Sequence, residues 1–262
     1  MPKCAFSLPA LLLVFAAATV AQSNGNSPDR AFIAHARKMY YSLQQEGVRE
    51  LWCQARPGWS KVLTSVPSPS PDAKKQALAH LSTTEFKVVI TESDTEVTVE
   101  QSADHSSGEV STDLAAIIDF VRADIQQTFD LWRMVTFKPL LPGPKLAYRL
   151  EHRAGKYDLF DGGGQQLELD EKGLIQTISA SIPGAPANLS IPLRYDESTH
   201  GLVLSSLGLR TVAEASPLLE MTLQYLEQDG LQLPSAIICK TQHPFGVVST
   251  EVKINRYEIV RR

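Results

Sequence analysis

The chain has 262 residues, of which 43% are apolar and 21% are charged, and its formal net charge is −4. These proportions are ordinary for a globular protein and exclude wholesale disorder. The net negative charge argues against a nucleic-acid-binding protein. After residue 20 no apolar run approaches the roughly 18 residues that a membrane-spanning helix requires, so we expect no transmembrane segment.

Residues 1–21 have the pattern of a cleaved secretory signal peptide. Lys3 supplies a positive charge, an uncharged apolar stretch follows, and Thr19 and Ala21 are small residues at positions −3 and −1 of a cleavage site. We therefore expect a mature chain that begins near Gln22 and a periplasmic or secreted location. Cleavage removes Lys3 alone among the charged residues, which takes the formal charge from −4 to −5.

Residues 22–82 are expected to form a helical N-terminal segment. Apolar residues recur at helical spacing over residues 28–54, with a break near Gly47, and again over residues 71–82. A Pro- and Ser-rich linker at residues 67–71 separates these two amphipathic helices.

Residues 83–262 are expected to form a sheet domain that also contains a long helix. Apolar residues alternate with polar ones from Phe86 to Val99, which predicts a hairpin. Thr112 then caps the clearest helix of the chain, which runs to about Thr136, where a run of prolines ends it.

From Leu146 onward the apolar period changes to two, and turns recur about every ten residues. This pattern predicts an antiparallel meander of about eight strands. In the last strand the parity changes at Asn255 and Arg256, which predicts a β-bulge and a curved sheet. The expected fold class is therefore α+β, with a curved antiparallel β-sheet that is covered on its concave side by the amphipathic helices.

Residue types that carry catalytic or metal-binding chemistry are scattered along the chain. The six histidines occur singly, and none has a second histidine or a cysteine at metal-ligand spacing. The glycine run at residues 162–164 lies between two expected strands and lacks the lysine and the helix of a phosphate-binding loop. No serine lies in a nucleophile elbow. We expect no metal, no other cofactor and no enzyme; a hydrolase with an unrecognised site is the alternative in that class.

Cys53 and Cys239 remain after cleavage, in a compartment where disulfides persist. Either they pair, in a bridge that ties the N-terminal helical region to the last part of the sheet, or they are two buried free thiols. The sequence leaves both alternatives open.

The C-terminal strands carry a resemblance to a known family. A strand over residues 219–225 precedes a turn that contains Asp229, Gly230 and Pro234, and the closing strand runs to residues 255–257. Together with the order of signal, helix, strands, helix and meander, this pattern resembles the periplasmic lipoprotein-carrier superfamily, which includes LolA-type carriers and outer-membrane lipoprotein-sorting proteins. The resemblance implies an incomplete β-barrel with a helical lid over an apolar cavity.

An apolar lining between the helices and the sheet is the expected ligand site. It would bind lipid, acyl groups or an acylated protein by burying them without covalent chemistry. The alternative is a periplasmic protein-interaction or scaffold domain whose concave side is filled by its own helices and binds no ligand. The oligomeric state is left open by the sequence. The expected lining residues are Ile118, Val121, Ile125, Phe129, Trp132, Met221, Leu223 and Tyr225.

Overall fold

The computed structural model describes seven stretches of the chain. The described residues form four helices and one open antiparallel sheet of twelve strands. The expected signal peptide and nearly all of the Pro- and Ser-rich linker lie outside them. The described stretches are residues 27–65, 71–101, 112–161, 164–180, 188–211, 217–243 and 246–262.

The strands are arranged in the order β3-β2-β1-β12-β11-β10-β9-β8-β7-β6-β5-β4, with every neighbour antiparallel. Because β3 and β4 stand at the two ends of this order, the sheet does not close into a barrel. The strands are β1 (Val48–Pro57), β2 (Thr84–Thr91), β3 (Thr95–Gln101), β4 (Tyr148–Arg153), β5 (Lys156–Asp161), β6 (Gln165–Asp170), β7 (Ile175–Ala180), β8 (Leu189–Ser198), β9 (Gly201–Thr211), β10 (Leu219–Gln228), β11 (Leu231–His243) and β12 (Gly246–Arg261).

The helices precede the long meander. The expected helices over residues 71–82 and 112–136 are confirmed. A further short helix packs against β12. Just before this helix, the backbone N–H of Gly58 donates to the carbonyl of Glu251 (2.7 Å). The described helices are α1 (Ser27–Met39), α2 (Trp59–Ser65), α3 (Pro71–Leu81) and α4 (Thr112–Thr136).

Residues 48–57 form a strand, so the prediction that the first helix continues through them was wrong. Gly47 has a φ of +77°, which ends the preceding turn, and Leu51, Cys53 and Ala55 then alternate as fully buried residues of β1. This strand pairs with β2 on one side and with β12 on the other. The sheet therefore takes strands from both sides of the expected boundary after residue 82.

The bulge expected in the last strand is confirmed. Arg256 has a φ of +52°, and the register between β1 and β12 shifts between Trp52 and Gln54. The extra residue brings Ile254 and Tyr257, three positions apart, into the same core, where they are 4% and 7% exposed.

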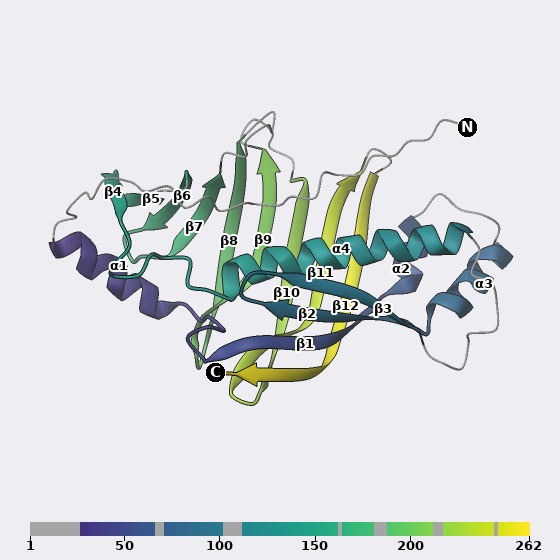
Figure 1. Cartoon of the computed structure of the whole chain (residues 1–262). Coiled ribbons are helices and arrows are strands. Elements are labelled where there is room, and N and C mark those ends of the chain that lie inside the picture. The colour runs from purple at the N-terminus through teal and green to yellow at the C-terminus, as the bar shows by residue number, and fades with distance from the viewer. Residues whose placement is uncertain are drawn as a thin grey trace.

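The long helix α4 lies inside the curve of the sheet. Figure 1 shows it crossing β8 to β12, while the β1–β3 part of the sheet curls below it. It contacts β2 and β3 at one end of the strand order and β9 in the other half, so the sheet wraps round the helix. The expectation of a curved sheet with a helix on its concave side is thereby confirmed.

The first helix, α1, packs against the β4–β9 half of the sheet. The ring of Phe32 lies on the ring of Tyr157, with 4.3 Å between their centroids. At the end of the helix, the hydroxyl of Tyr40 donates to the carbonyl of Gly173 (2.9 Å) and accepts from the N–H of Ile175 (2.6 Å). The turn between β6 and β7 therefore fixes the position of α1.

Cys53 and Cys239 are free and buried, so the bridged alternative does not hold. They lie on β1 and β11, which flank β12 on opposite sides. Cys239 stands opposite Thr250, whereas the neighbours of Cys53 stand opposite Asn255 and Glu258. The two cysteines are therefore offset along β12 by five or more residues, which corresponds to roughly 16 Å. A disulfide tolerates a Cα separation of about 7 Å at most.

Substitution of Gly173 by alanine should destabilise the protein by interfering with the packing of α1. A Cβ atom at Gly173 (φ +86°) would lie 2.6 Å from Cβ of Ala36, whereas one at Gly230 (φ +72°) would meet nothing within 4 Å. Both variants carry the strain of a positive φ, so the difference between them measures the clash. We expect G173A to lose about 1–3 kcal/mol more stability than G230A in urea unfolding. Equal losses would mean that α1 does not rest on this turn.

Thiol titration tests the state of the cysteines. Burial raises the pKa of both thiols, that of Cys239 to about 12, so neither forms the reactive thiolate in the native state. In a chain that begins at Gln22, Ellman's reagent should find no reactive thiol in buffer and two in urea. A mass lower by the two hydrogens of a disulfide would contradict this expectation.

Candidate functional site

The apolar face of α4 is the helix side of the candidate site. The five expected lining residues on the helix recur every three or four positions, which places them on one face. All five belong to the main hydrophobic core, and none exposes more than 8% of its surface. They are Ile118, Val121, Ile125, Phe129 and Trp132.

The sheet side of the site is formed by β10 and its neighbour β11. Met221, Leu223 and Tyr225 alternate along β10 and belong to the same core or pack against it. The indole N–H of Trp132 donates to the hydroxyl of Tyr225, with 3.3 Å between the heavy atoms. The fold therefore brings α4 against the strand on which the sheet-side lining residues were expected.

A second polar contact joins α4 to the adjacent strand. The hydroxyl of Thr128 lies 3.2 Å from the sulfur of Cys239, which stands opposite Met221 in the β10–β11 register. Thr128 was not among the expected lining residues. Thr128 lies on the buried face of α4 and is 2% exposed. Because its side chain is polar, the helical pattern of apolar residues did not indicate it.

The expected lining residues are packed against one another and against the core. Met221 and Leu223 expose 1% and 5% of their surface, and Phe129 meets Trp132 edge-on with 6.2 Å between ring centroids. Side chains rather than open space surround them. Whether these residues bind a ligand stays a prediction, but in this conformation they form a filled core.

The C-terminal half of α4 is held to the β2–β3 hairpin by hydrogen bonds. The guanidinium of Arg133 donates to the backbone carbonyl of Glu92 (3.1 Å) and to the hydroxyl of Thr95 (3.2 Å). The amide of Gln126 also donates to the backbone carbonyl of Thr95. Because Arg133 pairs with Asp130 as well, its charge is compensated at this largely buried position.

The turn between β2 and β3 also joins the end of α4 to the end of the chain. The carboxylate of Glu92 accepts from Lys138 (2.6 Å), Arg262 (3.2 Å) and Gln44 (3.3 Å). The hydrogen bond from Lys138 is the main cause that lowers the pKa of Glu92 below its ordinary value, and the charges of Lys138 and Arg262 add to it. This cluster connects four segments that are distant in the sequence.

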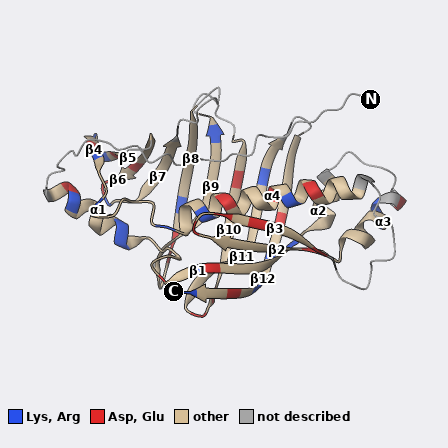
Figure 2. Ribbon diagram, in the orientation of Figure 1, with Lys and Arg blue, Asp and Glu red and all other residues tan. Residues whose placement is uncertain are grey.

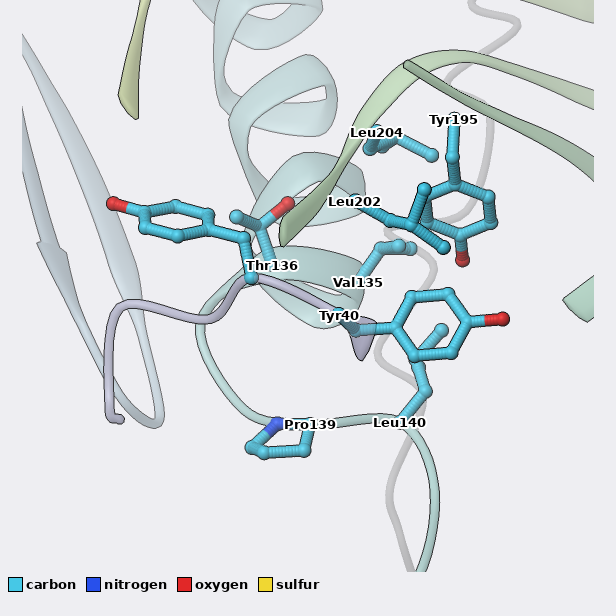
Figure 3. Close-up of a pocket in the computed structure, with 9 residues that line it drawn as sticks. Tyr40, Val135, Thr136, Pro139, Leu140, Tyr195, Leu202 and Leu204 are labelled. Atoms are coloured by element: carbon cyan, nitrogen blue, oxygen red, sulfur yellow. The ribbon is translucent and has the colours of Figure 1, made fainter. Parts of the chain in front are cut away.

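A small pocket lies where the ends of α1 and α4 meet β8 and β9 (Figure 3). Its volume is about 10 Å³, close to the space of a single water molecule. The sequence patterns did not single it out, because its residues come from four separate segments. They are Tyr40, Tyr41, Val135, Thr136, Pro139, Leu140, Tyr195, Leu202 and Leu204.

A wider depression of about 340 Å³ lies between α2 and β12. It is lined by Ser60, Lys61, Thr64 and Ser249. Ser249 alternates with the buried Val248 and Thr250 of β12, so it points away from the core. The depression therefore does not adjoin the expected lining.

Charged side chains of both signs are interspersed along α4 and the strands (Figure 2). In the described stretches no three His, Cys, Asp or Glu side chains are grouped so that they could hold a metal ion. None of the described helices is both long enough and apolar enough to cross a membrane.

No family model matches the chain, and no curated protein matches its sequence. Among solved structures, it is similar to a LolA superfamily protein from Nitrosomonas europaea, with 7% identity over 89% of this chain and 94% of that one and a TM-score of 0.37. It is also similar to a DUF1329 family protein from Desulfovibrio piger, with 14% identity, coverages of 88% and 93% and a TM-score of 0.36. A third structure, from Vibrio parahaemolyticus and described as an outer membrane lipoprotein-sorting protein domain, has 12% identity, coverages of 87% and 90% and a TM-score of 0.32.

Two of these three structures carry names from the superfamily that the pattern of the C-terminal strands resembles. The identities do not exceed 14% in these three structures, and the TM-scores lie below 0.5.

Protonation of Glu92 should weaken the protein at low pH. Because the pKa of this carboxylate is lowered in the folded state, its contribution to stability is present above the unfolded pKa of about 4.3 and is lost as the pH falls through the folded value. The stability difference between wild type and Glu92→Gln should therefore be constant above about pH 5 and shrink below about pH 4. Urea unfolding from pH 3 to pH 7 measures it; a difference that persists unchanged at pH 3 would rule out this role.

Proposed function

We propose that this protein is an exported, carrier-like protein that binds lipid, acyl or lipoprotein groups by non-covalent burial between α4 and the concave face of the sheet. One observation carries the proposal: the amphipathic helix α4 covers an apolar face of an open twelve-stranded sheet. The sheet curves around this helix, so that α4 contacts β2 and β3 on one side and β9 on the other. Such a surface supplies the apolar environment that a hydrocarbon chain requires.

In the described conformation, packed side chains fill the space between α4 and the sheet. Pockets for small molecules commonly have volumes of about 300–1,000 Å³, and the pocket at the end of α4 has about 10 Å³. A ligand would therefore have to take the place of side chains that now contact one another, such as Phe129 and Met221. This requires α4 to part from some of the strands around it.

The β2–β3 hairpin is the part of the sheet from which α4 would separate. The hydrogen bonds of Gln126 and Arg133 to this hairpin are local and few, and they can re-form when the helix returns. A few polar contacts with the hairpin combined with a large apolar face are suited to a helix that exchanges its contacts with the sheet for contacts with a ligand.

Export is part of the proposal and is supported by the sequence of residues 1–21. The charge of Lys3, the apolar stretch and the small residues before Gln22 are those of a secretory signal. Lipids and acylated proteins are accessible to a periplasmic or extracellular protein, which fits the proposed ligand class.

A protein-interaction or scaffold domain is the second candidate function. The observation that favours it is the packing itself, because the residues expected to line a cavity expose 8% or less, apart from the partly buried Tyr225. In this case the helix is a permanent part of the core and the partner binds elsewhere.

Native mass spectrometry of the mature protein, purified from its own host and followed by lipid extraction, separates the two candidates. Co-purifying acyl species support the carrier. A mass of the protein alone, together with failure to take up a fluorescent fatty acid, supports the interaction domain.

If α4 opens as a lid, weakening its hydrogen bonds to the β2–β3 hairpin should make ligand binding easier. Arg133→Ala removes the hydrogen bonds to the β2–β3 hairpin without altering the apolar lining, and the loss of about 1.4 kcal/mol from the closed state raises the apparent affinity for a fluorescent acyl probe roughly tenfold. Arg122→Ala is the matched control, because Arg122 pairs with Asp119 on the exposed side of the same helix.

Both variants are first compared with wild type by circular dichroism. The lid hypothesis predicts a change in affinity for R133A alone. Equal affinities of the folded wild type, R133A and R122A would contradict the separation of α4 from the hairpin.

A further inference from the structure

The pocket at the end of α4 contains two buried hydroxyl groups that lack a partner. Among the described residues, no hydrogen-bond partner lies within reach of the hydroxyl of Tyr195 or of Oγ1 of Thr136. Both residues line the pocket. A buried polar group without a partner costs about 1–3 kcal/mol, so two such groups at one small pocket indicate that something polar occupies it for part of the time.

The neighbouring tyrosines show that the two hydroxyls are exceptional at this place. The hydroxyl of Tyr40 is saturated by Gly173 and Ile175, and that of Tyr41 accepts from the N–H of Gln232 (3.1 Å). In Figure 3 the hydroxyl of Tyr195 points toward the ring of Tyr40. The two rings have a T-shaped arrangement, with 5.0 Å between their centroids. The free hydroxyl is therefore aimed into the pocket and not at solvent.

The chemistry of the pocket selects a neutral oxygen. The lining contains tyrosine, threonine, proline and aliphatic side chains, with no Lys, Arg, His, Asp or Glu among them. Burial raises the pKa of Tyr195 far above its ordinary value, so the hydroxyl remains a neutral donor. A carboxylate would be desolvated here without a cation to pair with, which is unfavourable. An ester or amide carbonyl, or a water molecule, has no such cost.

The pocket adjoins the expected lining of the ligand site. Thr136 lies one helical turn beyond Trp132 on α4, and Trp132 is hydrogen-bonded to Tyr225. Tyr225 is also close enough to Tyr195 to contribute to the rise of its pKa. An apolar chain beneath α4 would thus place a polar group at its end next to the Tyr195 hydroxyl.

We infer that this pocket is a subsite for one neutral, hydrogen-bond-accepting oxygen, which the hydroxyl of Tyr195 binds. In a bound ligand the oxygen is an ester or amide carbonyl at the end of an apolar chain; in the closed state a water molecule takes its place. The inference rests on the proposed function, and it adds that neutral acyl esters are preferred over free carboxylates.

Tyr195→Phe tests the subsite because it removes the hydroxyl and keeps the ring. Displacement of the fluorescent probe N-phenyl-1-naphthylamine is measured with methyl palmitate, palmitate and hexadecane. Wild type should bind the ester more tightly than the carboxylate. The variant should lose about three- to tenfold in affinity for the ester and none for hexadecane, as expected for one hydrogen bond.

Tyr257→Phe is the matched control. The hydroxyl of Tyr257 is also buried but donates to the carbonyl of Pro234 (2.5 Å), so its removal should lower the unfolding midpoint without a selective loss of ester binding.

The outcomes separate the subsite from the function. If wild type displaces the probe but Tyr195→Phe binds ester and hexadecane as wild type does, the ligand subsite is wrong and the carrier function stands; a lower unfolding midpoint of that variant would then show that the hydroxyl holds only a structural water. If wild type binds none of the three compounds, both the subsite and the proposed function are overturned.

Discussion

The pairing of β1 with β12 is the constraint on which the rest of the structure depends. It joins residues 48–57 to residues 252–261, so the first strand of the chain lies beside the last one. This pairing attaches the β2–β3 hairpin to the C-terminal strands and extends the meander into one continuous sheet. The bulge at Arg256 increases the twist at this junction. Without the pairing, the hairpin that holds α4 would have no fixed place relative to β10 and β11.

The position of α4 follows from this curved junction. Its apolar face meets β9 and the β2–β3 hairpin at once, so its large side chains are buried from more than one direction. At its C-terminal end, Arg133 and the Glu92 cluster link the helix to the hairpin and to the end of the chain. Apolar contacts thus hold the helix in the curve, while polar contacts at one end determine where it sits along the sheet.

The same packing determines what separates the carrier from the interaction domain. A core as tightly filled as that around Phe129 and Met221 stabilises the protein by itself. A carrier must therefore offer a ligand enough apolar contact to replace what the core loses. Among the described residues, the hydroxyls of Tyr195 and Thr136 are two of the three buried side-chain oxygens that lack a hydrogen-bond partner. They give a ligand with a polar end an advantage that a pure hydrocarbon does not have.

Local sequence patterns by themselves determined α3, α4, the β2–β3 hairpin, the meander and its bulge, because capping residues, prolines and the change from a helical period to a period of two act over neighbouring residues. They also identified the apolar face of α4 and the strand it meets. Only the tertiary structure decided that residues 48–57 form a central strand, since that choice depends on partners about 200 residues away. It likewise decided that the two cysteines are too far apart to pair, and it assembled the pocket around Tyr195 from four segments. Long-range pairing sets these features, and no short stretch of the chain encodes it.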